Sequence, residues 1–130
     1  METILLVQFM GALYGMLAVI FGAFGAHALK KTLTEEQLGS FETGVRYQMY
    51  HAIVLVVLGF NLNFDSGLEK AMVNCFMLGI FLFSFSIYAL VLGKSKGWNL
   101  RFLGPVTPIG GLLLVTAWGL LLYSFIKGFM

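Results

Sequence analysis

Residues 41–62 read FETGVRYQMYHAIVLVVLGFNL, a stretch that is polar in its first half and almost wholly apolar in its second. The apolar part, residues 49–62, is interrupted only by His51 and Asn61. It is too short to cross a membrane alone, because about 30 Å of hydrocarbon needs roughly 20 apolar residues in a helix. The stretch reaches that length only if it extends back through Arg46, so it decides how many membrane spans the chain has.

Longer apolar stretches lie on both sides of this segment. The whole chain is 59% hydrophobic and 11% charged, with a mean hydropathy of +0.91, which lies outside the range of soluble domains. A soluble fold of 130 residues could not bury so much apolar area. We therefore predict an all-α membrane protein, a four-transmembrane-helix bundle in which residues 1–130 form a single integral membrane domain. The expected spans are, approximately, residues 4–29, 41–62, 71–92 and 108–129.

The charged residues and the single cysteine exclude several classes of function. Eight basic and six acidic residues give a formal net charge of +2, and the basic residues occur singly or in pairs. Without a basic run we predict no nucleic-acid partner. Cys75 is the only cysteine, so neither an intrachain disulfide nor a thiolate metal site can form. No nucleophile, base and orienting acid form a catalytic set, and we predict no enzyme activity, metal or cofactor.

Helix-capping residues mark where the spans begin. Thr34 and Gln37 have the spacing of a capping box, which predicts a short interfacial helix over about residues 34–41 with its apolar side chains resting on the bilayer. Thr107 suits the N-cap position of the last span, and Pro108 suits its first helical position.

The basic residues predict the orientation in the membrane. Six of them lie in or next to loops one and three, which join spans one to two and three to four, whereas only Lys70 and Lys127 lie on the other side. Cytoplasmic segments carry the excess of Lys and Arg, so loops one and three should face the cytoplasm and both termini the outside. The six are Lys30, Lys31, Arg46, Lys94, Lys96 and Arg101.

Small residues line one face of the first span at alternating steps of four and three. Side chains this small let helix backbones approach closely in lipid, so the face is a packing seam for another helix of the bundle or for a second copy of the chain. Gly79, Gly110 and Gly111 are possible counterparts in later spans. The seam residues are Gly11, Gly15, Ala18, Gly22 and Gly25.

Polar and ionisable residues gather at the start of the second span. On a helix Glu42, Arg46 and Tyr50 share one face, and we expect Arg46 to pair with Glu42. Two interpretations stay open. The cluster is either a hydrogen-bonded belt that fixes span two against span one, or a site for a lipid headgroup, a small anion or a proton, because ionisable residues are costly to retain in a membrane. The candidate residues are His27, Glu42, Arg46, Tyr47, Tyr50 and His51.

Three blocks of the sequence resemble a known family. GAFGAHAL at residues 22–29, FETGVRYQMYH at 41–51 and GPVTPIGG at 104–111 are similar to the small multi-pass membrane proteins that include bacterial YgdD and YwdK and eukaryotic transmembrane protein 256. The resemblance implies a multi-pass protein of the bacterial plasma membrane. It implies no activity, because the family is one of unknown function, and no catalytic residue carries over.

These observations predict a small integral plasma-membrane protein with a structural, accessory or lipid-interacting role. Its expected partners are membrane lipids, and a homo-oligomer is compatible with the seam. The alternative is a small transporter or channel for a small anion, a proton or a lipid. Proton-coupled drug export is disfavoured, because the first span has only Gln8 as an interior polar residue and no acid.

Overall fold

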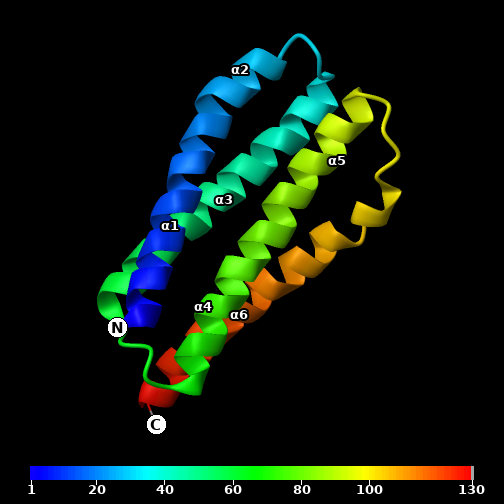
Figure 1. Ribbon diagram of the computed structural model, residues 1–130. Coiled ribbons are helices and arrows are strands. Elements are labelled where there is room, and N and C mark those ends of the chain that lie inside the picture. Colours follow the sequence, from blue (N-terminus) through cyan, green and yellow to red (C-terminus); the bar gives the residue numbers. More distant parts are fainter. Residues whose placement is uncertain (130) are drawn as a thin grey trace.

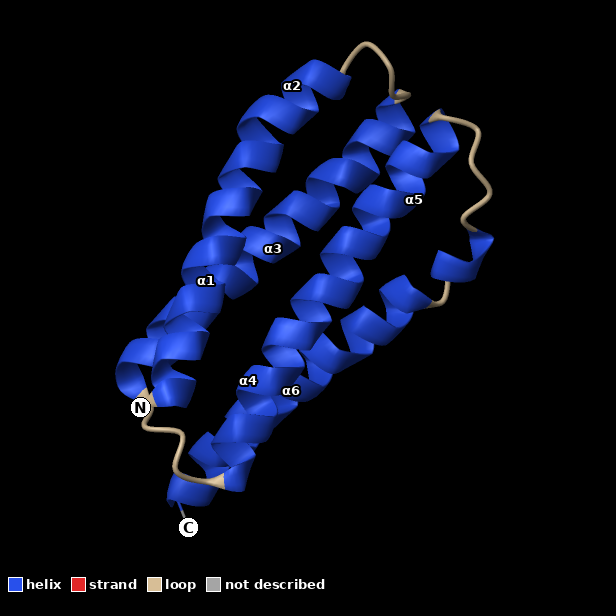
Figure 2. Cartoon of the chain, viewed as in Figure 1, coloured by secondary structure: helices blue, strands red, loops and turns tan. Residues whose placement is uncertain are grey.

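The computed structural model describes residues 1–129, apart from the side chains of Ala26 and Phe129. This part of the chain contains helices and loops and no strand (Figure 2). Helices α1 (Glu2–Ile20), η1 (Phe21–Gly25) and α2 (Ala26–Leu29) follow one another without a break, as do α4 (Gly67–Ile80), η2 (Phe81–Phe85) and α5 (Ser86–Ser95). The other elements are α3 (Glu35–Asn61), the short η3 (Arg101–Leu103) and α6 (Val106–Phe129).

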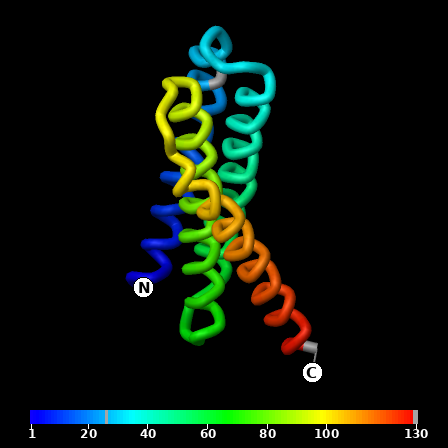
Figure 3. The backbone as a smooth tube through the Cα atoms, turned by 90° about the vertical axis from the view of Figure 1, so that its right-hand side faces the viewer, coloured from blue at the N-terminus to red at the C-terminus, as the bar shows by residue number. Residues whose placement is uncertain are grey.

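The helices form two antiparallel hairpins that pack side by side. The first joins α1 and α2 to α3, and the second joins α4 and α5 to α6 (Figure 1). Both termini lie at the same end of the bundle, opposite the loops that follow α2 and α5. Figure 3 shows α6 crossing the neighbouring helices obliquely rather than running parallel to them. The all-helical fold class predicted from the sequence is therefore confirmed.

Three long helical stretches are long and apolar enough to cross a membrane, namely Glu2–Leu29, Gly67–Ser95 and Arg101–Gly128. Helix α3 is not among these three, although it has 27 residues. Its first half carries Glu35, Glu36, Glu42 and Arg46, which lower its hydropathy.

The start of α3 agrees with the sequence in one respect and differs in another. The Thr34 hydroxyl accepts from the Gln37 backbone N–H at 3.1 Å, and the Gln37 side chain accepts from the Thr34 N–H at 3.0 Å, so the capping box is confirmed. The prediction of a separate interfacial helix is wrong, because α3 runs without interruption from this cap to Asn61. Phe41, expected on the bilayer, is instead buried with its ring centroid 5.0 Å from that of Tyr88.

Helix α6 begins earlier than the sequence predicted. It starts at Val106, so Thr107 is not its N-cap. The Thr107 hydroxyl instead forms a hydrogen bond with the Ser86 hydroxyl of α5. Pro108 still lies in the first turn, where its missing N–H removes a donor that has no partner within the helix.

The small-residue seam of α1 lies against α3. A Cβ atom added to Gly11 would lie 2.9 Å from Val56 Cγ2 and 3.0 Å from the Val56 backbone nitrogen. Further along, added Cβ atoms at Gly22 and Gly25 would lie 3.1 Å from Val45 and 3.2 Å from Phe41. The partner helix of this seam is therefore α3 of the same chain.

Glycines later in the chain allow close packing within the second hairpin. An added Cβ at Gly79 would lie 2.9 Å from the Leu114 side chain, and one at Gly110 would lie 2.4 Å from the backbone nitrogen of Phe83. These contacts join α4 and η2 to α6. Small residues thus hold each hairpin together by close backbone approach, as in other membrane helices.

Each hairpin also contains a π-helical turn in its first long helix. The two turns, η1 and η2, face each other, since the rings of Phe21 and Phe85 meet edge to face at 6.2 Å. Such turns are rare and occur frequently at functional sites. The η2 turn contributes residues to both clusters described next.

Candidate functional site

One face of α3 is buried inside the bundle and carries a glutamine. This buried face consists of Phe41, Gly44, Gln48 and Ala52, all of which are shielded from solvent. Gln48 is 0% exposed. Its Nε2 donates to the Tyr14 carbonyl oxygen at 2.8 Å, and its Oε1 accepts from the Tyr88 hydroxyl at 2.7 Å. A single side chain therefore connects α3 to α1 and to α5.

A second polar contact fixes α3 against η2. The Ser84 hydroxyl donates to the Gly44 carbonyl oxygen at 2.8 Å, and both residues are buried. Gly44 needs to be small here, because an added Cβ would lie 2.8 Å from Cε1 of Tyr88. Every buried side-chain nitrogen or oxygen among the described residues has a hydrogen-bond partner, so this interior is fully satisfied.

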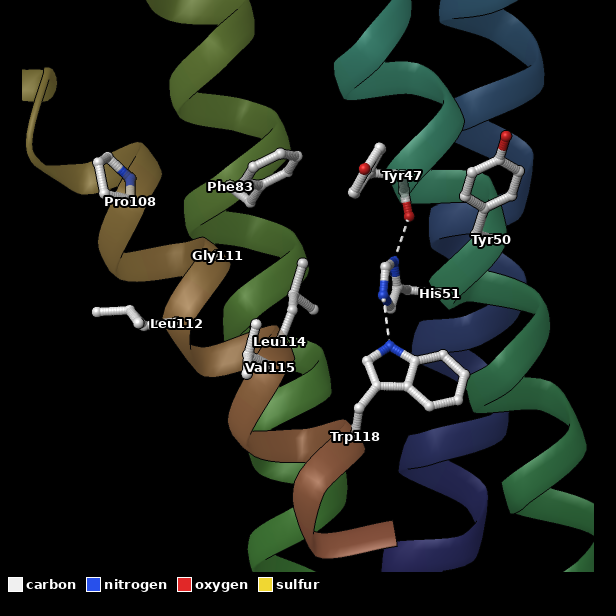
Figure 4. Close-up of a pocket in the computed structure, with 10 residues that line it drawn as sticks. All are labelled: Tyr47, Tyr50, His51, Phe83, Pro108, Gly111, Leu112, Leu114, Val115 and Trp118. Carbon is white, nitrogen blue, oxygen red and sulfur yellow. Dashed lines mark hydrogen bonds between the residues drawn. The ribbon is translucent and has the colours of Figure 1, made fainter. Parts of the chain in front are cut away.

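The neighbouring face of α3 carries Tyr47, Tyr50 and His51, and we call it the groove face. The indole N–H of Trp118 on α6 donates to His51 Nε2 at 3.0 Å, while His51 Nδ1 lies 2.6 Å from the Tyr47 carbonyl oxygen (Figure 4). Because an indole N–H can only donate, Nε2 is the acceptor and Nδ1 carries the proton. The imidazole thus bridges its own helix and α6.

A groove of about 710 Å³ separates the groove face from α6, with Phe83 of η2 beside it. Figure 4 shows α3 as one wall and α6 as the other, with the His51–Trp118 bridge between them. The Tyr47 ring lies 5.1 Å from that of Phe83 and 5.9 Å from that of Tyr50. The α6 wall is apolar and consists of Pro108, Gly111, Leu112, Leu114 and Val115.

The groove has few polar atoms, and two of them have no hydrogen-bond partner among the described residues. Among the described residues no hydrogen bond involves the hydroxyl of Tyr47 or of Tyr50. Both side chains are exposed, at 42% and 55%. In Figure 4 the Tyr50 hydroxyl points away from Trp118, toward the end of the bundle that carries loops one and three. The groove can therefore receive an apolar molecule and offer it two hydroxyl groups.

The remaining predicted residues lie outside this groove. Glu42 and Arg46 are exposed on the loop-one half of α3, and the Arg46 guanidinium reaches the Thr43 hydroxyl at 3.4 Å rather than the expected Glu42. His27 is exposed on α2, and no hydrogen bond or ring contact among the described residues joins it to the groove. The structure thus brings together Tyr47, Tyr50 and His51 of the six candidates.

Several residues of the site carry only weak signals in the sequence. Gln48 is one polar residue in a segment that contains many, and Ser84 and Tyr88 lie in an otherwise apolar span. Trp118 resembles an ordinary lipid-facing aromatic until its partner His51 is known. Among the described residues no group of three or more His, Cys, Asp or Glu side chains could hold a metal ion.

Comparison with known proteins identifies the family. A family model described as a protein of unknown function, DUF423, matches residues 21–111, which include the π turns, all of α3 and much of the groove. The chain belongs to the DUF423 family. No solved structure matches it.

The curated relatives of this DUF423 protein are membrane proteins. The UPF0382 membrane protein SH2409 of Staphylococcus haemolyticus is 39% identical over 91% of this chain and 93% of its own length. YwdK of Bacillus subtilis is 35% identical over 91% of this chain and 94% of its own. The inner membrane protein YgdD of Escherichia coli is 33% identical over 89% and 86%. The chain is thus a membrane protein, and the resemblance found in its sequence is confirmed.

Proposed function

We propose that this DUF423 protein is a four-span protein of the plasma membrane that binds a membrane lipid in the groove between α3 and α6, in an accessory or structural role. The observation that carries the proposal is the groove itself. It is lined by apolar and aromatic side chains, its volume of about 710 Å³ lies in the range of small-molecule sites, and its unpaired hydroxyls can hydrogen-bond to a ligand.

The placement of α3 supports a count of four spans. Only residues 30–34 and 62–66 connect it to α2 and α4, and it runs antiparallel to both of these neighbours (Figure 1). Its 27 residues reach about 40 Å at 1.5 Å per residue, which exceeds the roughly 30 Å of hydrocarbon. The polar groups on its buried face are hydrogen-bonded, so they do not prevent insertion. We therefore propose one integral domain over residues 1–130, with spans of about 4–29, 41–62, 71–92 and 108–129.

The proposed orientation places loops one and three in the cytoplasm and both termini outside. It rests on the excess of basic residues at the loop-one and loop-three end, six against two. A reporter enzyme that is active only outside the cytoplasm, fused after Met130, should be active. Activity of a cytoplasm-dependent reporter at the same position would contradict this orientation.

Lipid binding follows from what surrounds the groove in a membrane. The groove is open rather than enclosed, because Tyr47, Tyr50 and Leu112 on its walls are exposed. In a bilayer such a space is filled by hydrocarbon. The two tyrosine hydroxyls have no hydrogen-bond partner in the described part of the chain and would gain hydrogen bonds from the polar part of a lipid. An unsatisfied polar group in hydrocarbon costs several kcal/mol.

Transport of an anion or a proton is less well supported. Such a path needs polar groups that are free to exchange partners, whereas every buried polar side-chain atom of the described residues is already bonded. Flux of protons or chloride into proteoliposomes above that of protein-free vesicles would favour the transporter alternative.

The direct test fills the groove. Gly111 lines it, and an added Cβ there would meet only the Phe83 ring, at an ordinary 3.7 Å. Gly111→Phe should therefore occupy the groove with little strain. Gly119→Phe is the matched control, because Gly119 lies on the same helix, is exposed and has nothing within 4 Å of an added Cβ.

Native mass spectrometry of protein purified in mild detergent should find one retained lipid on the wild-type chain and on Gly119→Phe. The Gly111→Phe variant should lose it. Equal lipid retention by all three proteins would show that the groove is not the binding site.

A further inference from the structure

We infer that the groove holds one acyl chain of an anionic phospholipid from the leaflet at the loop-one and loop-three end, with the phosphate bound at Arg46. This inference rests on the lipid binding proposed above and adds the leaflet and the headgroup. Three independent features carry it: the length of the groove, the position of its closed end, and the charges at its open end.

The groove has the length of one leaflet. Its α6 wall extends from Pro108 to Trp118. Ten residue steps of 1.5 Å make about 15 Å, which is half of the roughly 30 Å of hydrocarbon in a bilayer. Trp118 lies near the middle of α6, which runs from Val106 to Phe129. The groove thus extends from one membrane surface to about the bilayer centre.

The inner end of the groove is closed by side chains from opposite walls. Trp118 of α6 donates its indole N–H to His51 of α3, and their ring centroids are 6.0 Å apart. Behind them the Phe76 ring meets the Trp118 ring edge to face at 5.5 Å. A chain lying in the groove must therefore end at this bridge, as an acyl chain ends at the bilayer centre.

Positive charge lies on both walls beyond the residues that line the groove, on the side of loops one and three. Arg46 lies one helical turn before Tyr50 on the same side of α3, and Arg101 lies in η3 just before α6, so each wall of the groove leads to an exposed arginine. The acid nearest along α3 is Glu42, one further turn away. Guanidinium groups bind phosphate oxygens through paired, charge-assisted hydrogen bonds.

The Arg46 charge and the Tyr50 hydroxyl should lie at the same depth in the membrane. Tyr50 points its hydroxyl toward the arginine end (Figure 4), and residues on a helix four positions apart are neighbours. A phosphate at Arg46 would therefore also be within reach of the Tyr50 hydroxyl, which has no partner among the described residues. The basic side chains of Lys94, in the last turn of α5, and of Lys96, just after it, add to the attraction for an anionic headgroup.

The test uses lipid vesicles of equal parts phosphatidylglycerol and phosphatidylcholine with the same acyl chains. Protein reconstituted there and then released into detergent is analysed by native mass spectrometry for the lipid it retains. Wild-type protein should retain phosphatidylglycerol about fivefold over phosphatidylcholine, which is about 1 kcal/mol. Arg46→Gln should remove most of this preference, and Arg46→Lys, which keeps the charge without the paired donors, should give an intermediate value.

Two controls are needed. One tests whether the position of the charge matters, and the other tests whether the Arg46→Gln variant is folded. Lys70→Gln removes one positive charge at the opposite end of the bundle and should leave the preference unchanged. Retention of phosphatidylcholine by Arg46→Gln would show that this variant is folded and that its groove is intact.

The outcomes also separate this inference from the proposed function. Equal retention of both lipids by wild-type protein, with loss of both in Gly111→Phe, would overturn the anionic headgroup and leave lipid binding standing. A preference that survives in Arg46→Gln would overturn the role of Arg46. Retention of neither lipid by the wild-type protein would overturn both proposals.

Discussion

The buried face and the groove face of α3 lie side by side on one helix but differ in whether their polar groups are hydrogen-bonded. On the buried face both ends of the Gln48 amide are bonded, to Tyr14 and to Tyr88, and the side chain is inaccessible. On the groove face His51 is held by Trp118, while the hydroxyls of Tyr47 and Tyr50 have no partner among the described residues.

This difference divides the polar cluster into two kinds of residue. The sequence left open whether the cluster is a structural belt or a binding site. The bonded groups of the buried face act as a belt, because they join α3 to the helices around it. The unpaired groups of the groove face are free for a ligand. We therefore propose that this segment divides the two roles, with Gln48, which was not among the six candidates, joining the helices and the groove face binding a ligand.

The largest effect is expected on the buried face. Gln48→Leu leaves the Tyr88 hydroxyl and the Tyr14 carbonyl without their Gln48 partner, and it should lower the free energy of unfolding by about 2 kcal/mol. Thermal unfolding in detergent measures this change. In Gln48→Leu combined with Tyr88→Phe the orphaned hydroxyl is gone, so the loss should be smaller than the sum of the two single changes. Additive losses would show that the two side chains act independently.

A smaller effect is expected at the His51–Trp118 bridge between α3 and α6. Trp118→Phe keeps most of the ring but removes the N–H that His51 Nε2 accepts, and it should cost about 1 kcal/mol. Thermal unfolding again provides the measurement, and Trp98→Phe, at an exposed loop tryptophan, is the control. A wild-type melting temperature for Trp118→Phe would mean that the bridge does not hold α6 to α3.

The smallest effect on stability is expected at the groove face. Tyr50→Phe removes a hydroxyl that forms no hydrogen bond with a described residue, so the unfolding free energy should change by less than about 0.5 kcal/mol. Retention of lipid in native mass spectra should nevertheless decrease, because the ligand loses a hydrogen bond. Destabilisation as large as that of Gln48→Leu would remove the distinction between the two faces.

Local signals in the sequence were sufficient for the helical class, the family and the capping box at Thr34. They were insufficient where packing decides the structure. Leu33 and Phe41 are apolar residues beside the capping box, where side chains were expected to contact the bilayer. In the structure they are buried, because α5 covers them. The N-cap predicted at Thr107 was wrong, since its hydroxyl bonds to Ser86 instead of to its own helix.

The groove could not be predicted for a geometric reason. Its walls come from residues far apart in the chain, such as Tyr47 and Val115, and its width depends on the oblique path of α6. A hydropathy pattern predicts which face of a single helix is apolar. It does not predict the angle at which two helices cross. The segment around Tyr47 and His51 was nevertheless found, because polar residues in a membrane span are unusual wherever they point.

The π turn at Phe81–Phe85 makes the length of its helix as important as its composition. A π turn accommodates one residue more than an α turn, so a one-residue deletion within it can restore α geometry and leave the faces beyond it in place, whereas a one-residue deletion in α4 would rotate the two flanking parts against each other by about 100°. After a deletion in α4, Tyr88 could not point toward Gln48, nor Val91 lie in the core, while the start of α4 kept its packing. A one-residue deletion in the loop before Arg101 would be absorbed without rotating any helix. The π turn is thus the place in the α4–α5 helix where one residue can be lost without rotating the faces on either side.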